Sequence, residues 1–206
     1  MSDARRIVES GYDRVAERYL EWSARIPDDP RLRFLAELTG RLDGGARVLD
    51  LGCGAGVPCT AALAGEHDVL GVDVSAAQLD LARRNVPGAR FERADMTGLS
   101  FPDGSFDAVT AFYSVLHVPR EEQGALFTRI AAWLRPGGWF LAALGCSGAD
   151  GVEAAWLGAP MFFSSHAPAE NRRLLTAAGF TLEVDEPVTM QEPEGPATFH
   201  WVLGRR

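Results

Sequence analysis

The chain has 206 residues, 47% of them hydrophobic and 23% charged, with a formal net charge of −8 at pH 7. These values are typical of an ordinary globular domain, and they provide no dense basic patch to neutralise a nucleic-acid backbone. No apolar run approaches the roughly 20 residues needed to cross a bilayer, and the charged start of the chain predicts no signal peptide. Three cysteines, Cys53, Cys59 and Cys146, lack metal-ligand or disulfide spacing, so we expect no metal and a cytoplasmic setting.

Hydrophobic periodicity predicts two helices before the first strand, at residues 3–25 and 32–42. Strands and helices then alternate: strands are predicted at 47–51, 68–72, 89–93, 106–112 and 139–144, and helices at 57–64, 75–85 and 120–134. Ser75 is predicted as the N-cap of the helix at 75–85. The alternation stops in the Gly- and aromatic-rich segment 145–168, and resumes with a helix at 169–178 and strands at 181–184 and 198–203. Strands that alternate with helices indicate an α/β protein whose parallel sheet is covered on both faces.

A glycine-rich turn follows the first predicted strand in the segment ARVLDLGCGAGVP, residues 46–58. Val57 stands where the dinucleotide-binding fingerprint has its third glycine. Asp50 precedes the first glycine by two residues, and its carboxylate would repel a pyrophosphate and attract a cation. The turn therefore predicts a ligand that carries positive charge and no phosphate. The glycines of the turn are Gly52, Gly54 and Gly56.

The run VLDLGCGAG resembles motif I of the class I S-adenosylmethionine-dependent methyltransferases. S-adenosylmethionine carries an ammonium, a sulfonium and a carboxylate but no phosphate, as the turn requires. Further along, FDAVTAFYSVLHV is similar to motif IV, and LRPGGWF to the turn before the fifth strand. The resemblance extends from about residue 43 to 144 and is closest to small-molecule methyltransferases of quinone and natural-product biosynthesis. It implies S-adenosyl-L-methionine as the cofactor.

The resemblance also implies an architecture, a Rossmann-like three-layer sandwich with a seven-stranded, mostly parallel sheet and an antiparallel last strand. A single methyltransferase domain would span residues 1–206. Its expected parts are an N-terminal helical lid (1–42), a cofactor-binding core (43–144), a substrate-side insertion (145–168) and a C-terminal helix with strands (169–206).

The resemblance assigns cofactor contacts residue by residue. Asp73 lies where the family's acidic residue binds both ribose hydroxyls, and two acceptor oxygens suit a vicinal diol. Asp95 and Met96 resemble the pair that recognises adenine, the carboxylate by accepting from the exocyclic amine. The full predicted set is Tyr19, Asp50, Gly52, Cys53, Gly54, Gly56, Asp73, Val74, Gln78, Asp95, Met96 and Phe112.

The acceptor side is less determined by the sequence. His117 follows the fourth strand and is either a general base, with a pH limb near its ordinary pKa of roughly 6.5, or the cap of the next helix. Tyr12 and Tyr19 share one face of the first helix, where they either close over the cofactor or pack in the core. His200 is expected to be structural or exposed. The residues expected at the substrate, with core packing as the alternative for several, are Tyr12, Tyr113, Trp156, Met161, Phe162 and His166.

The resemblance and the aromatic segment 145–168 together predict methyl transfer to a small organic molecule by in-line displacement. The Asp/Asn-Pro-Pro-Tyr/Phe motif of nucleobase-amine methylation is absent from the fourth strand, which argues against a nucleic-acid substrate. Three alternatives stay open: an enzyme that binds the cofactor without transferring methyl, such as a cyclase, a non-catalytic binding module, and a protein substrate. A monomer or a homodimer is expected.

Overall fold

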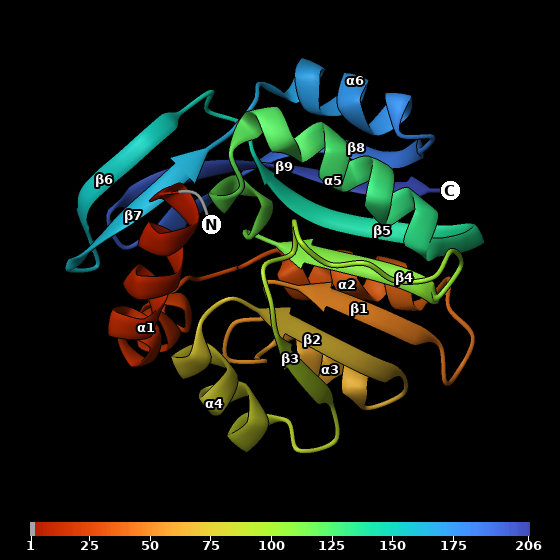
Figure 1. Cartoon of the computed structure of the whole chain (residues 1–206), viewed down its shortest axis with the longest axis horizontal. Coiled ribbons are helices and arrows are strands. Elements are labelled where there is room, and N and C mark those ends of the chain that lie inside the picture. The colour runs from red at the N-terminus through yellow and green to blue at the C-terminus, as the bar shows by residue number, and fades with distance from the viewer. Residues whose placement is uncertain (1–2) are drawn as a thin grey trace.

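The computed structural model describes residues 3–206 as a seven-stranded sheet with helices on both faces and a separate two-stranded hairpin (Figure 1). The first two residues of the expected lid, 1–42, lie outside the described residues. The strands are β1 Arg47–Leu51, β2 Asp68–Asp73, β3 Arg90–Arg93, β4 Phe106–Phe112, β5 Leu134–Gly145, β6 Asp150–Trp156, β7 Ala159–Ser164, β8 Thr181–Glu192 and β9 Gly195–Arg205. The helices are α1 Asp3–Ser23, α2 Arg31–Thr39, α3 Cys59–Ala64, α4 Ala76–Asn85, the 3-10 helix η1 Val115–His117, α5 Arg120–Trp133 and α6 Pro168–Ala177.

The main sheet has the strand order β3-β2-β1-β4-β5-β9-β8. Strands β1 to β5 are parallel to one another, and β9 is antiparallel to both β5 and β8. The predicted seven-stranded, mostly parallel sheet with an antiparallel last strand is therefore confirmed. Because the chain passes from β1 to β2 on one side and later to β4 on the other, a crevice opens at the carboxyl ends of β1 and β4, where open α/β sheets bind ligands.

The two faces of the sheet bury separate apolar cores, and β1 contributes to both. Leu49 and Leu51 point to the side of α5 and α6, whereas Val48 points to the side of α2 and α3. This alternation follows from the two-residue period of a strand, and it explains why Val48, Leu49 and Leu51 are all apolar. On the α2 side, Phe34 stacks on Trp201 of β9 with ring centroids 4.3 Å apart.

Segment 145–168 is predicted as a substrate-side insertion in which the alternation of strands and helices stops. In the structure it forms a β6–β7 hairpin, which packs against α1 (Figure 1). Residues 150–155 of β6 are exposed, so this strand has no buried face to give the sequence an alternating pattern. Gly11 of α1 allows the close approach, because a Cβ there would lie 2.7 Å from the carbonyl oxygen of Pro160.

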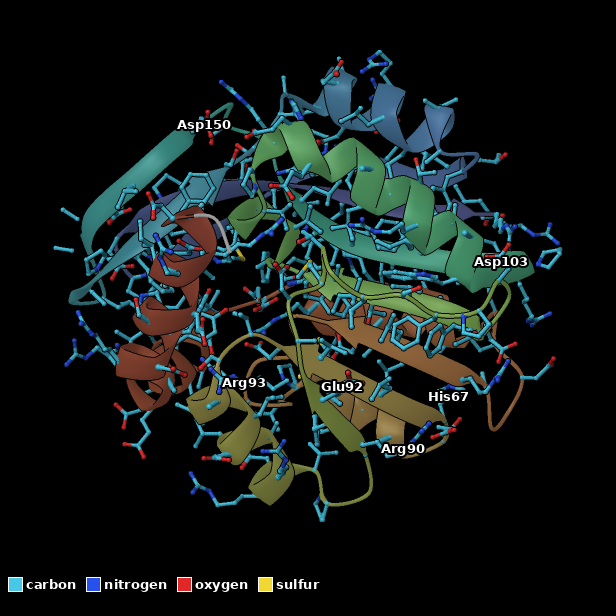
Figure 2. The ribbon with its side chains drawn as sticks, in the orientation of Figure 1. His67, Arg90, Glu92, Arg93, Asp103 and Asp150 are labelled. Carbon is cyan, nitrogen blue, oxygen red and sulfur yellow. The ribbon has the colours of Figure 1, made fainter. Side chains whose placement is uncertain are left out.

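The two edge strands of the main sheet have features that follow from their position, and one of them is longer than the sequence predicts. β8 extends to Glu192, well beyond the predicted 181–184, and includes Pro187, which an edge strand tolerates because one side needs no ladder donors. The other edge, β3, carries Arg90, Glu92 and Arg93, whose charges discourage pairing with another strand (Figure 2). Across residues 3–206, no helix is both long and apolar enough to span a membrane.

Candidate functional site

Three adjoining cavities lie between α1 and the carboxyl ends of the parallel strands. The inner cavity, about 80 Å³, is bounded by Gly52, Asp73 and Asp95. The outer cleft, about 790 Å³, is lined by residues of α1, of β6 and β7, and of β8 and β9. The small cavity, about 40 Å³, includes Arg31 in its lining. Tyr19 of α1 lines all three and so marks their junction.

The glycine-rich turn brings bare backbone to the inner cavity. Gly52 has φ +73°, and a Cβ there would lie 2.3 Å from the Cβ of Ser114, so only glycine fits. Gly54 donates its backbone N–H to Oδ2 of Asp73 at 2.9 Å. Gly56 is not among the residues that line the three cavities; it packs against the end of α4, so its observed role is in packing.

Asp73 ends β2 with both carboxylate oxygens facing backbone donors. Its Oδ1 accepts from the N–H of Ser75 and its Oδ2 from that of Gly54, each at 2.9 Å. Burial raises the pKa of Asp73 to about 6, although these backbone hydrogen bonds lower it in part. Each oxygen keeps a further lone pair, so the carboxylate can still accept from two hydroxyls.

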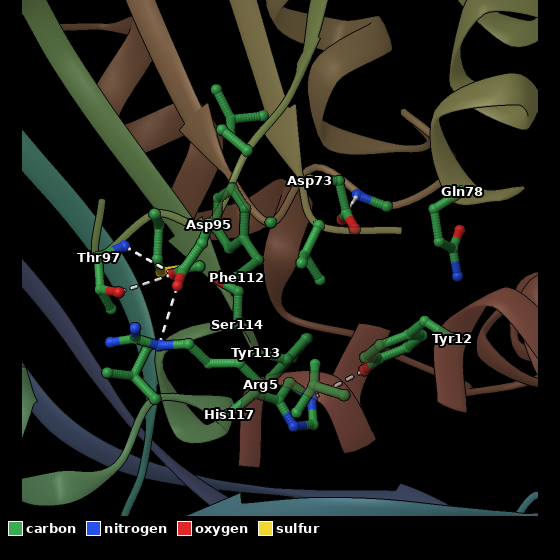
Figure 3. A pocket seen from close by; sticks show the side chains of 18 of the residues that line it. Arg5, Tyr12, Asp73, Gln78, Asp95, Thr97, Phe112, Tyr113, Ser114 and His117 are labelled. Atoms are coloured by element: carbon green, nitrogen blue, oxygen red, sulfur yellow. Dashed lines mark hydrogen bonds and ion pairs between the residues drawn. The ribbon is translucent and has the colours of Figure 1, made fainter. Parts of the chain in front are cut away.

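Gln78 lies in the first turn of α4, whose N-cap is the predicted Ser75. Its side chain is buried and lines the inner cavity (Figure 3). Neither its amide nitrogen nor its amide oxygen has a hydrogen-bond partner in the described part of the chain. A buried amide without partners costs about 1–3 kcal/mol, so this side chain is suited to a polar ligand in the cavity.

Asp50 lies beneath the turn, buried to 2% exposure, rather than at an open mouth. The hydroxyls of Thr60 and Thr110 donate to its two oxygens at 2.6 and 2.8 Å. Burial raises the pKa of Asp50, and the two hydroxyls and Arg31 offset part of that shift. Arg31 lines the same small cavity and pairs with Asp29 at 2.7 Å. An acid and a base on one cavity match the ammonium and carboxylate of an amino-acid group.

Asp95 lines the inner cavity from the loop after β3, and its oxygens already have partners (Figure 3). Oδ1 accepts from the backbone N–H and the hydroxyl of Thr97 at 2.9 and 2.8 Å, and Oδ2 pairs with Nε of Arg5 at 2.9 Å. Arg5 belongs to α1 and also pairs with Glu122. These ion pairs hold α1 against the loop after β3 and against α5, on either side of the inner cavity. Met96 also lines this cavity.

The side chain of His117 does not cap a helix, because both of its ring nitrogens have other hydrogen-bond partners. Its Nδ1 lies 2.8 Å from the carbonyl oxygen of Phe162, and its Nε2 lies 2.8 Å from the hydroxyl of Tyr12 (Figure 3). A carbonyl only accepts, so we assign the proton to Nδ1, which leaves Nε2 to accept from Tyr12. Burial lowers the pKa of His117 to about 4 and raises that of the Tyr12 phenol, so both groups are neutral near pH 7.

Tyr113 lines the inner cavity and the outer cleft immediately after β4. Its backbone has φ +55°, a left-handed conformation that costs free energy for a residue with a side chain. The ring packs edge-on against Phe199 at 4.6 Å between centroids, and its hydroxyl donates to Asp29 at 3.3 Å. Such strain at a cavity wall is typical of functional sites.

The structure brings most of the predicted residues together. Tyr12, Tyr113, Trp156 and His117 line the outer cleft. The predicted cofactor residues that line one or more of the cavities are Tyr19, Asp50, Gly52, Cys53, Gly54, Asp73, Val74, Gln78, Asp95, Met96 and Phe112.

Three of the residues expected at the substrate lie elsewhere. Met161 is fully buried between the hairpin and α1, so it is a core residue. Phe162 contributes its carbonyl oxygen to His117, and its ring is not part of the cleft lining. His166 lies 3.1 Å from the carbonyl of Arg120, outside the cleft lining.

Several cavity residues carry no sequence signal. Charged segments without a recognisable motif contain Arg5, Asp29 and Arg31. Glu192 ends β8, and Glu194 lies in the turn that follows, which the sequence does not predict. His200 is fully buried and lies 2.7 Å from Asp185, so it is structural. Within residues 3–206, no group of three or more His, Cys, Asp or Glu side chains is placed to hold a metal ion.

Comparison with known proteins places this cavity system in context. Residues 48–138 match the family described as a methyltransferase domain. The chain is similar to trans-aconitate 2-methyltransferase of Variovorax paradoxus, with 39% identity over 127 residues that cover 58% of this chain and 48% of that protein. It spans between 20% and 48% of the length of the first curated relatives it matches.

Two solved structures share the fold over almost the whole chain. Burkholderia thailandensis 1,6-didemethyltoxoflavin-N1-methyltransferase, solved with bound 1,6-didemethyltoxoflavin and S-adenosylhomocysteine, has a TM-score of 0.73 and 23% identity, over 96% of this chain and 86% of that one. The [4+2]-cyclase SpnF has a TM-score of 0.73 and 20% identity, over 96% and 94%. These two structures confirm the predicted fold, and the domain match confirms the predicted resemblance to methyltransferases.

Proposed function

Because residues 48–138 match a methyltransferase domain, we propose that the chain uses S-adenosyl-L-methionine to methylate a small organic molecule. The observation that carries this proposal is the connection between the inner cavity and the much larger outer cleft. Tyr12, Tyr19, Tyr113 and His117 line both, so a ligand in one would meet a ligand in the other at these side chains. The relatives act on unrelated acceptors, so none of those acceptors is carried over to this chain.

The described residues fit the cofactor group by group. Asp73 offers two free lone pairs to the ribose hydroxyls, and the unpartnered amide of Gln78 lies on the same cavity. Asp95 and Met96 form the part of the wall proposed for adenine. Asp50 and Arg31 share the small cavity, where they would take the ammonium and the carboxylate of the methionine group. When bound, the cofactor supplies an electrophilic methyl group on its sulfonium.

The chain's own residues would exclude water and orient the acceptor. Tyr12 donates its proton to Nε2 of His117, so the lone pairs of its hydroxyl oxygen are free to accept from an acceptor group. An imidazole with a pKa of about 4 is a weak base, so the strong general base considered from the sequence does not fit this geometry. We therefore assign His117 a positioning role: it fixes the hydroxyl of Tyr12. The pH limb expected near 6.5 moves to about 4.

The alternative of a cyclase-like enzyme keeps one supporting observation, the likeness in fold to SpnF. A direct test uses cofactor whose methyl carbon is isotopically labelled, with a panel of small acceptors. Methyl transfer predicts label in the product and one S-adenosylhomocysteine per turnover. A product without label, formed only when cofactor is present, would favour the cyclase-like reading. A labelled protein in place of a labelled small molecule would favour a protein substrate.

Binding can be tested without knowing the acceptor. Calorimetry should show micromolar affinity for S-adenosylhomocysteine and none for NAD, because Val57 stands where the dinucleotide fingerprint has its third glycine and the buried carboxyl of Asp50 lies beneath the same turn. NAD binding as tight as that of S-adenosylhomocysteine would refute the proposed cofactor.

A further inference from the structure

The lining of the outer cleft carries more negative than positive side chains, which does not suit an anionic acceptor. Its lining includes one guanidinium, that of Arg31, and this group is already held by Asp29 through bonds of 2.7 and 2.8 Å. The ion pair is well shielded, with side-chain exposures of 12% and 14%. The carboxylates that line the cleft are Asp29, Glu153, Glu192 and Glu194.

Three of these carboxylates, Glu153, Glu192 and Glu194, have no ion-pair partner among residues 3–206; Asp29 pairs with Arg31. Glu194 accepts from the indole N–H of Trp22 at 2.9 and 3.0 Å, and a neutral donor leaves its charge in place. Glu192 has no Arg or His partner within the described part of the chain. Burial, Glu194 and Asp29 together raise the pKa of Glu192 to about 7. Its ionised form is therefore destabilised in the free protein and would be relieved by a positive charge in the cleft.

The walls beside these carboxylates are aromatic. Tyr19 stacks on Trp22 at 5.9 Å between centroids, and Trp156 approaches both, at 5.6 and 6.2 Å. Phe163 and Phe199 continue the lining. Ring faces attract organic cations through their quadrupoles, and they attract them more strongly where water is excluded. Aromatic walls with unpaired carboxylates are thus suited to a ligand that is both apolar and positively charged.

We propose that the methyl acceptor is an organic cation, a molecule with an aromatic or apolar body, a protonated or quaternary nitrogen that anchors it, and a separate atom with a lone pair. That atom forms the new bond to the methyl group as the bond from the methyl group to the cofactor sulfur breaks, and S-adenosylhomocysteine leaves. The cleft itself defines the site, through its volume of about 790 Å³ and its continuity with the inner cavity at Tyr12, Tyr19 and His117. Glu192 and Glu194 supply the charge selection, and Trp22 and Trp156 the apolar surface. The same carboxylates reject acceptors whose recognition depends on a carboxylate or a phosphate. This inference rests on the proposed function, because it names the substrate class of that site.

The test compares three probes that share a benzyl group: benzyltrimethylammonium, benzyl alcohol and phenylacetate. Each is titrated by calorimetry at about pH 8, where Glu192, with a pKa of about 7, is ionised. The protein is first saturated with S-adenosylhomocysteine. We expect the affinity order cation, alcohol, anion, with the cation bound at least about tenfold more tightly than the anion. Phenylacetate binding as tightly as the cation would overturn the proposal.

Charge-neutral variants identify the residues responsible. Glu192→Gln combined with Glu194→Gln keeps the side-chain shape and an acceptor for Trp22, and should reduce the cation preference to within about twofold. Glu186→Gln removes the same charge from the same strand outside the cleft, in an exposed pair with Arg33, and should leave the preference unchanged. A preference that survives in the double variant would refute the assignment.

The experiments distinguish a wrong cofactor from a wrong acceptor class. If S-adenosylhomocysteine does not bind, the cofactor proposal is wrong, and the order of the three probes can still be measured on the free protein. If S-adenosylhomocysteine binds and the probe order is reversed, only the cationic acceptor is wrong. If the double variant does not fold, the wild-type order and Glu192→Gln alone decide the matter.

Discussion

Lowering the pH through about 6 should weaken cofactor binding, and Asp73 should be the cause. Burial holds the pKa of this carboxyl at about 6 in the free protein, well above its ordinary 3.8. Ribose hydroxyls would donate to the ionised form, so a ligand that binds only this form loses affinity by the factor 1 + 10^(pKa − pH). That factor is about 1.1 at pH 7 and about 11 at pH 5, a loss of roughly tenfold.

The effect on folding has the opposite sign. A carboxyl with a raised pKa binds its proton more tightly in the folded state, so its contribution to stability falls as pH rises from about 4 to about 6. The ionised form costs the folded protein on the order of 3 kcal/mol at neutral pH. Lowering the pH through this range should therefore weaken cofactor binding and, at the same time, remove the destabilisation of the free protein that the ionised Asp73 causes.

Calorimetry with S-adenosylhomocysteine between about pH 5 and pH 7.5 measures the binding effect. Asp73→Asn should weaken binding at neutral pH by about 1.5–3 kcal/mol, the value of a hydrogen bond to a charged group, and should flatten the pH profile. Asp68→Asn provides the control, because Asp68 begins the same strand and pairs with Arg90 at the surface. A wild-type affinity that does not change with pH, or a variant that keeps the full slope, would refute the role of Asp73.

Three further changes test other parts of the site. Gly52→Ala should lower the free energy of unfolding in urea by more than about 2 kcal/mol, because its Cβ would meet Ser114 at 2.3 Å, whereas Gly44→Ala has open space and should cost little. Gln78→Leu should raise thermal stability by removing a buried unpaired amide, yet weaken S-adenosylhomocysteine about tenfold; unchanged affinity would remove Gln78 from the site. His117→Ala should raise KM for the acceptor more than it lowers kcat, and the pH–rate profile should lose its limb near 4; a limb near 6.5 in the wild type would restore the general base.

Local patterns predicted the parallel strands and the glycine turn, and the resemblance to a known family added the order of the sheet and the residues expected at the cofactor. The segment RVLDL gives its side chains to both cores alternately, and the turn after it needs glycine at Gly52 for a backbone angle that the spacing already implied. Ser75 caps α4 as predicted, because capping is a contact within a single turn. The alternation and the cap depend on residues fewer than about ten positions apart, so the chain order carries them. The crowding at Gly52 comes from Ser114, a distant part of the chain, so there the sequence indicates only the backbone angle.

The acceptor side could not be predicted in the same way. Tyr12 and His117 are 105 positions apart, and their hydrogen bond exists only because α1 lies across the end of β4. The depressed pKa of His117 follows from burial by the hairpin and α1, which no spacing in the sequence encodes. β6 was missed because an exposed strand has no alternating pattern.

The sequence by itself determined the parallel strands, the glycine turn and the acid that ends β2, since each is a local pattern of burial, backbone angle or charge. Only the tertiary structure decided which side chains line the same cleft. It brought Asp29, Glu192 and Glu194 together from the loop before α2, from the end of β8 and from the turn after β8. The physical reason is that the charge and dielectric environment of a cleft depend on every element that surrounds it, and those elements come from distant parts of the chain.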